Sequence, residues 1–283
     1  MSVGIKRKLA CLGIVMMLSA SSAQAALYSN GFETNTNGWT GASQVASGTN
    51  GIPSASGSFH AVVGTGNGSF TQWGGYNYGA GGAVPTAFQE YTTSVDIYLN
   101  VAGGFSNDTR FDFSSAINNS AGNFQRDFIF NAGFYNDATG PGANTSRFVI
   151  SAGNNSQPGS AFAKDPGHNP IAISTTGWYT FQDHFYDNGG VLAVDLSIFD
   201  ALHNLVGSWT LSNPADLISG IGGNRYGWFD YNQFPTLAID NASLTLAQEI
   251  EPAAVPEPAS LAIWGLGMLG LATGAVRRRK RAN

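Results

Sequence analysis

The sequence predicts an exported all-β protein: an antiparallel two-sheet sandwich, preceded by a signal peptide and followed by one C-terminal transmembrane helix. Three observations lead to this prediction. Residues 26–250 show short apolar alternations broken by Gly, Asn, Ser and Pro, with almost no helical period. A basic segment and then an apolar segment begin the chain. A proline-rich, an apolar and a basic segment end it.

The N-terminus has the three parts of a secretion signal in order. Lys6–Lys8 are basic, residues 9–20 form an apolar run of twelve, and Ala23 and Ala25 supply the small residues of a cleavage site. The run is too short to span a bilayer comfortably, so a removable signal over residues 1–25 is favoured over an anchor. The only cysteine, Cys11, would leave with it, so the mature chain is expected to contain no disulfide.

The segment 26–250 is predicted to be one domain of about nine or ten strands. Its clearest strand is 191–199, where apolar residues alternate with polar ones after an Asn-Gly-Gly turn at 188–190. The preceding strand is expected at 178–185, which makes a hairpin. Further strands are predicted at 27–32, 59–64, 88–99, 127–135, 147–152, 205–211 and 236–246.

One short segment has helical signals. Residues 213–218 combine a cap residue, a proline in the first turn and an acid near the helix start, which predicts a single helical turn between strands. No repeat of 20–50 residues is visible, which disfavours a propeller or solenoid. Strands without intervening helices favour a two-sheet sandwich.

The charge of the body restricts its partners. Residues 26–250 contain five Lys or Arg and sixteen Asp or Glu, a net charge of −11. Nucleic-acid binding is not expected, because such a chain lacks the basic surface that neutralises phosphates. Neutral sugars or Ca²⁺ are better matched to an acidic body.

The C-terminus predicts a linker, a membrane span and a tail. Residues 251–260 are proline-rich, which favours an extended linker. Residues 261–276 are sixteen uncharged residues, a transmembrane helix slightly shorter than the hydrocarbon core of a bilayer. Residues 277–283 are basic and are expected in the cytoplasm, which leaves the body outside.

These parts in this order resemble the PEP-CTERM sorting signal, in which the tripeptide corresponding to Pro256, Glu257 and Pro258 is recognised by an exosortase. The resemblance implies cleavage near the tripeptide and removal of the anchor. It further implies a Gram-negative envelope: transient anchoring in the inner membrane with the body in the periplasm, then the outer surface or extracellular matrix, with exopolysaccharide as a partner. A plain tail anchor is the alternative.

Two patterns in the body resemble jelly-roll families. Phe32-Glu33 with Trp39, paired with residues 238–244, is similar to the edges of carbohydrate-binding modules, and the hairpin at 178–199 is similar to concanavalin-like lectins. The first resemblance implies a structural Ca²⁺ between Glu33 and Asp240, since hard oxygen ligands suit this ion. The alternative is that Asp240 faces solvent on an edge strand and Glu33 accepts ordinary backbone hydrogen bonds.

Two aromatic clusters are candidate sugar sites, at residues 73–78 and 224–231. Flat rings suit the apolar face of a pyranose, and polar neighbours suit its hydroxyls. The candidate residues are Trp73, Tyr76, Arg225, Tyr226 and Trp228. The alternative is that Trp73, Trp228 and Phe229 fill the core.

Nothing in the sequence predicts catalysis. The four histidines lack zinc-binding spacing, a Gly-x-Ser-x-Gly elbow is absent, and the acids have no distinguishing spacing. A non-catalytic carbohydrate-binding protein of the exopolysaccharide layer is therefore expected. A structural matrix or adhesion protein is the first alternative, and a polysaccharide-active enzyme is the second.

Overall fold

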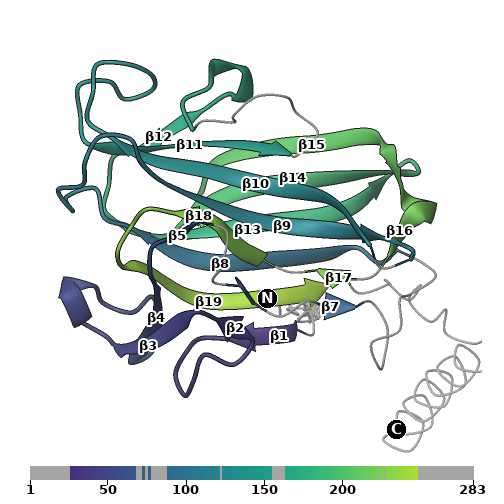
Figure 1. The fold of residues 1–283 in the computed structure, drawn as a ribbon, viewed down its shortest axis with the longest axis horizontal. Helices are drawn as coiled ribbons and strands as arrows, with labels where there is room; N and C mark the ends of the chain where they lie inside the picture. Colours follow the sequence, from purple (N-terminus) through teal and green to yellow (C-terminus); the bar gives the residue numbers. More distant parts are fainter. Residues whose placement is uncertain are drawn as a thin grey trace, which may run out of the picture.

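The computed structural model describes residues 26–67, 72–73, 76–77, 88–121, 123–154, 163–222, 224–225 and 227–247. They form two antiparallel sheets that pack face to face. The axes of the long strands of both sheets lie roughly along the horizontal of Figure 1. This confirms the predicted all-β sandwich. The predicted signal peptide, linker, membrane helix and tail lie outside the described residues. Within the described residues, no helix has the length and apolarity needed to cross a membrane.

Sheet A has eight strands, and its order departs from the order of the chain. Strands far apart in sequence therefore become neighbours. Across the sheet they are β15 (Leu205–Leu217), β14 (Val191–Asp200), β13 (Gly177–Asn188), β8 (Tyr91–Leu99), β19 (Leu237–Leu246), β4 (Phe59–Val63) and β3 (Ala42–Ala46), with β1 (Ala26–Asn30) also paired to β19.

Sheet B has nine strands, and a separate pair lies outside both sheets. Across sheet B the strands are β12 (Ile171–Ile173), β11 (Arg147–Asn154), β10 (Phe124–Tyr135), β9 (Thr109–Asn119), β18 (Gly227–Asn232), β6 (Gln72–Trp73) and β2 (Trp39–Thr40). In addition, β16 (Ile221–Gly222) pairs with β9 and β5 (Gly66–Asn67) with β18. The separate pair is β7 (Tyr76–Asn77) with β17 (Asn224–Arg225), and short 3₁₀ turns occur at Thr49–Gly51, Pro166–His168 and Ile218–Gly220.

Aromatic side chains join the two sheets. The inner residues of β13, Phe181 and Phe185, are fully buried. Phe181 meets Phe130 of sheet B edge to face at 5.1 Å between ring centroids, and Phe185 meets Phe128 at 5.5 Å. Such contacts are possible because every second residue of a strand points into the sandwich.

Two expectations about strands needed correction. The helical turn predicted at 213–218 is wrong: β15 continues to Leu217 and the 3₁₀ turn begins at Ile218. The extended backbone lets the buried carboxylate of Asp216 reach Gln125 and Arg126 of sheet B, and this tertiary contact outweighs the local helix signals. Strand β9 is not among the predicted strands, because six consecutive residues in it are buried on both faces and so do not alternate between apolar and polar.

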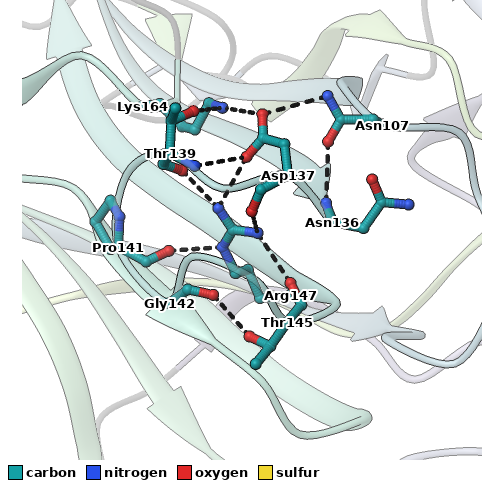
Figure 2. A network of polar contacts seen from close by, with 9 residues as sticks. All are labelled: Asn107, Asn136, Asp137, Thr139, Pro141, Gly142, Thr145, Arg147 and Lys164. Carbon is teal, nitrogen blue, oxygen red and sulfur yellow. Dashed lines mark hydrogen bonds and ion pairs between the residues drawn. The ribbon is translucent and has the colours of Figure 1, made fainter.

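The loop between β10 and β11 is built around one arginine, as Figure 2 shows. The side chain of Arg147 is fully buried and donates to main-chain oxygens of the loop that encloses it. The carbonyl acceptors are Asp137, Thr139, Pro141 and Thr145, and the carboxylate of Asp137 is a further acceptor at 3.2 Å.

The same loop is tied to the segment that follows β11. Lys164 donates to the Asp137 carboxylate at 2.6 Å, and its ammonium lies 4.2 Å from the centroid of the Tyr135 ring. Tyr135, Val149 and Ala163 form a second small core beside this contact. Sheet B is therefore packed on its outer side as well as its inner side in this region.

Candidate functional site

The outer face of sheet A contains a pocket with a volume of about 390 Å³. It lies where β8, β13 and β19 run side by side, and the turn after β14 and the loop before β4 complete its walls. Its lining residues are Ala55, Ser94, Asp96, Trp178, Thr180, Asp200, Ala201, His203 and Asn241. We refer to it as the sheet-A pocket.

Strand alternation explains which residues reach this pocket. In β8 the odd-numbered side chains from Tyr91 to Leu99 are buried, so Ser94 and Asp96 point outward. Thr180 of β13 pairs directly with Asp96 in the antiparallel register. A bulge in β19 follows Asp240, and Asn241 there has a left-handed backbone with φ of 47°. The bulge places the Asn241 amide beside Asp96.

Neutral donors hold the Asp96 carboxylate in place. The Thr180 hydroxyl donates to Oδ1 at 2.6 Å, and the Asn241 amide donates to Oδ2 at 2.8 Å. Each carboxylate oxygen can accept a further hydrogen bond. Ser94, which lines the same pocket, shares a 2.8 Å hydrogen bond with Ser243 of β19. The floor of the pocket is therefore an ordered polar surface whose carboxylate oxygens can accept further hydrogen bonds.

Trp178 supplies the aromatic part of the pocket and is itself fixed. Its indole Nε1 donates to the carbonyl of Pro53 at 2.8 Å. Its ring meets Tyr98 edge to face at 5.3 Å and His60 at 5.9 Å. Because these contacts set its orientation before any ligand arrives, little conformational entropy is lost when a ligand packs on the ring.

A tight turn after β14 brings a second carboxylate to the rim. Asp200 accepts hydrogen bonds from the backbone amides of Leu202 and Asn204 at 2.8 and 2.9 Å, and the Asn204 side chain donates to it as well. These bonds lower the pKa of Asp200, so it is ionised at neutral pH. His203 follows in a left-handed conformation with φ of 60° and lines the same rim.

The two residues predicted to bind calcium converge on a single loop. Glu33 accepts from the backbone amides of Ser58 and Phe59 at 3.0 and 3.1 Å. Asp240 accepts from the amides of Ala55 and Ser56 at 3.0 and 3.2 Å. A Ca²⁺ ion at these oxygens would have to displace N–H donors, so calcium binding here stays a prediction.

The environment of Asp240 differs from the expected alternative of an exposed edge position. Asp240 is fully buried, and its strand β19 lies between β8 and β4. Burial raises the pKa of Asp240 to about 6, and the nearby charge of Asp96 acts in the same direction. The alternative for Glu33, ordinary backbone hydrogen bonds, is what the structure shows.

The two aromatic clusters, which are about 150 residues apart in the sequence, become β partners. Arg225 pairs with Tyr76, and Trp228 pairs with Gln72. Trp73 pairs in turn with Trp39 of β2. The side chains of these candidate residues lie outside what the structure describes, as does the whole of Tyr226. Pairing of the main chain places the two segments at one end of sheet B.

Phe229 follows the alternative expectation for these clusters. It is buried and packs against Phe113 at 5.1 Å and Trp39 at 6.2 Å between ring centroids. The remaining predicted positions lie outside the described residues: Ala23 and Ala25 of the cleavage site, and Pro256, Glu257 and Pro258 of the sorting tripeptide.

The sheet-A pocket is not among the predicted sites, although one of its strands carries a signal in the sequence. The alternation Ser94, Asp96, Tyr98 within an apolar strand indicates an outward polar row. Nothing in the sequence, however, shows that this row lies between those of β13 and β19. That adjacency comes from the strand order.

Comparison with protein families identifies the C-terminal segment. Residues 254–280 match the PEP-CTERM protein-sorting motif. This confirms the resemblance drawn from Pro256, Glu257 and Pro258. The motif implies a secreted protein that is anchored in a membrane before an exosortase processes it. No curated protein matches the sequence of the chain.

Several solved structures of low sequence identity are similar to this chain. The CBM2 module of the evolved Dit of Lactobacillus casei BL23 phage J-1 is 12% identical, with 79% of this chain and 96% of that chain covered and a TM-score of 0.39. Peanut lectin with a 9mer peptide is 8% identical, with 78% and 98% covered and a TM-score of 0.34. The Bauhinia forficata lectin in complex with GalNAc is 15% identical, with 80% and 99% covered and a TM-score of 0.32.

At these values the similarity to solved structures says nothing about ligands. The match to the PEP-CTERM motif does support a conclusion, because it rests on the sequence of residues 254–280 and on the order of the parts within them. The chain thus carries a PEP-CTERM protein-sorting motif at the end of a β-sandwich domain.

Proposed function

We propose that this protein is a non-catalytic carbohydrate-binding protein of the extracellular exopolysaccharide layer, delivered there by the exosortase route. The observation that carries the proposal is the sheet-A pocket, where an oriented Trp178 ring stands beside the fixed polar groups of Asp96, Thr180 and Asn241. Sorting takes the body to the compartment where such polymers accumulate.

The pocket offers both kinds of contact that a sugar needs. A pyranose has an apolar C–H face, which packs on an aromatic ring, and hydroxyls at its edge, which need paired donors and acceptors. Trp178 supports the first contact. The Asp96 carboxylate and the Asn241 amide support the second, and their mutual hydrogen bond keeps them in place before binding.

The described acids argue for binding rather than hydrolysis. A glycosidase needs one protonated and one ionised carboxyl group on either side of the scissile bond. At the pocket, Asp200 has a lowered pKa and so is a poor proton donor. Two acids have raised pKa values. Asp183, at about 8, is fully buried between the sheets and faces away from the pocket, and Asp240, at about 6, is fully buried behind the backbone amides of Ala55 and Ser56 and does not line the pocket.

Two features outside the pocket belong to the same proposal. The paired aromatic segments, with Trp73, Tyr76, Arg225, Tyr226 and Trp228, would extend the contact with a polymer at one end of sheet B. A structural Ca²⁺ held by Glu33 and Asp240 would fix the loop at 55–59, which forms one wall of the pocket. The convergence of both carboxylates on that loop supports this part.

The test is affinity electrophoresis of the purified protein through gels that contain exopolysaccharide. Ala201 lines the pocket from an exposed turn, so Ala201→Trp fills the pocket without disturbing the core. We expect this variant to weaken retardation by about tenfold or more, since it removes the space for a sugar ring. Leu202→Trp is the matched control, because Leu202 is the exposed neighbour and does not line the pocket.

Equal retardation of both tryptophan variants and the parent protein would contradict binding at this pocket. If Trp73→Ala and Trp228→Ala then abolish retardation, the paired aromatic segments are the site instead. If no tested polymer retards the parent protein, a structural matrix or adhesion role becomes the better explanation.

A further inference from the structure

Charge is distributed unequally between the two sheets. As described, the eight strands of sheet A contain no lysine or arginine. The basic residues of the described chain belong to sheet B or its neighbours: Arg110 in β9, Arg126 in β10, Arg147 in β11, Lys164 after β11 and Arg225 in β17. A ligand that approaches the outer face of sheet A therefore meets carboxylates without a competing lysine or arginine from these strands. His203 lines the rim of the pocket and, after the hydrogen bonds from Asn204, contributes to the lowered pKa of Asp200.

The carboxylates of the sheet-A pocket are held by neutral groups. Asp96 accepts hydrogen bonds from the Thr180 hydroxyl and the Asn241 amide, and Asp200 accepts them from backbone and side-chain amides. Neither forms an ion pair with Lys or Arg among the described residues. By contrast, Asp137 in the loop after β10 meets Arg147 and Lys164, and Asp216 of β15, which does not line the pocket, meets Arg126 of sheet B. Two negative charges at the pocket are thus oriented but not neutralised by a Lys or Arg of the described chain.

An aromatic ring completes this environment. Trp178 lines the pocket together with Asp96, and Tyr98 stands against the edge of its indole. Trp is the most favourable side chain for a cation placed over its face, and nearby carboxylates strengthen the same attraction. The combination of a ring and unneutralised acids favours a compact positive group, such as an ammonium.

We propose that the sheet-A pocket selects an amine-bearing sugar, a hexosamine unit whose amino group is free and positively charged, and rejects polymers of uronic acids. The inference rests on the proposed function, since it names the class of sugar for the same pocket. The ammonium would lie beside Asp96 and Asp200, and the ring of the sugar would pack on Trp178. A uronate would bring a third negative charge to these two carboxylates, which costs free energy.

A metal ion is a weaker explanation for the same acids. Ca²⁺ prefers six to eight oxygen ligands, several of them charged. The described residues contain no group of three or more His, Cys, Asp or Glu arranged to hold an ion. The ammonium group of an amino sugar needs fewer carboxylate partners than a metal ion, because the hydroxyls of the same sugar can form further hydrogen bonds with the pocket.

Calorimetry with four oligosaccharides of equal length tests the selectivity. The probes are a hexosamine oligomer with free amines, its fully N-acetylated counterpart, a neutral glucan and an oligouronate. We expect the free-amine oligomer to bind about tenfold more tightly than the acetylated one and to weaken steeply with added salt. The oligouronate is expected not to bind.

Two carboxylate variants test the site. Asp96→Asn keeps the size and removes the charge, so its affinity for the free-amine oligomer should fall to that for the acetylated one. Asp195→Asn is the control. Asp195 lies on the same sheet and accepts a hydrogen bond from the Thr210 hydroxyl, just as Asp96 accepts one from Thr180, but Asp195 does not line the pocket. It should bind as the parent does.

The outcomes separate this inference from the proposed function. Equal affinity for the free-amine and acetylated oligomers, or binding of the oligouronate, overturns the inference and leaves carbohydrate binding intact. A loss of equal size in Asp96→Asn and Asp195→Asn also overturns it, because the attraction would then be to the acidic surface as a whole. If none of the four probes binds, both proposals fail.

Discussion

The outer faces of the two sheets are built on different principles. On sheet A, the outward residues of β8 and β13 are half-buried and polar, and a pocket opens between them. On sheet B, all eight residues of β11 are buried, and the Arg147 loop and a second small core lie beside that strand. The acids that line the sheet-A pocket have no Lys or Arg partner among the described residues, whereas Asp137 beside sheet B and Asp216, which faces sheet B from β15, pair with arginine and lysine.

We infer from this difference that sheet B contributes mainly to stability and the outer face of sheet A mainly to ligand binding. The polar groups of the Arg147 loop beside sheet B are bonded to one another, and they fix one arrangement of the chain. Polar groups on the face of sheet A are ordered by neutral neighbours and keep acceptor capacity. Substitutions on sheet B should therefore change stability first, and substitutions at the sheet-A pocket should change binding first.

Arg147→Ala should have the largest effect on stability, with a loss of about 3–5 kcal/mol in the free energy of unfolding, because several buried carbonyls and one carboxylate lose their donor. Chemical denaturation measures it. Arg147→Lys should recover only part of the loss, since one ammonium cannot reach all acceptors. A loss below about 1 kcal/mol for the alanine variant would mean that the loop is not built around this side chain.

Asp183→Asn tests the interior between the faces. Asp183 of β13 is fully buried, accepts from Ser115 of β9 at 3.1 Å, and has a pKa raised to about 8 by burial. Its folded pKa exceeds its unfolded value of 3.8, so its contribution to stability is complete below about pH 4 and is lost as pH rises through 8. We expect the parent to lose a few kcal/mol between pH 4 and 9.

The asparagine variant should lack that pH dependence, because it removes the titrating group and keeps its shape. Denaturation at pH 4, 6 and 9 gives the comparison, with Asp187→Asn at the exposed end of β13 as the control that keeps the parent profile. Parallel pH profiles for the parent and Asp183→Asn would show that Asp183 does not titrate in this range.

Glu33→Gln should have the smallest effect, about 1 kcal/mol, because the amide oxygen still accepts one of the two backbone N–H bonds. Thermal unfolding with calcium and with chelator completes the test. A calcium-dependent rise in Tm that disappears in Glu33→Gln would establish the predicted ion at Glu33 and Asp240. Equal Tm values in both buffers would show that the two carboxylates act through backbone amides alone.

Parts of the candidate site were within reach of the sequence. The hairpin of β13 and β14 was predicted from alternation and an Asn-Gly-Gly turn, and the structure confirms it. The aromatic segments around Trp73 and Trp228 were predicted separately, and their pairing was not. The sheet-A pocket was missed, since Asp96, Thr180 and Asn241 are ordinary polar residues on three strands that are distant in the sequence.

The sequence by itself determined the all-β class, the acidic body and the sorting segment at 254–280, because each depends on local composition or short-range order. Only the tertiary structure decided which strands are neighbours, that β9 is buried on both faces, and that the backbone stays extended at Asp216. The physical reason is that sheet pairing and charge pairing join residues tens to hundreds of positions apart, and no local pattern encodes such partners.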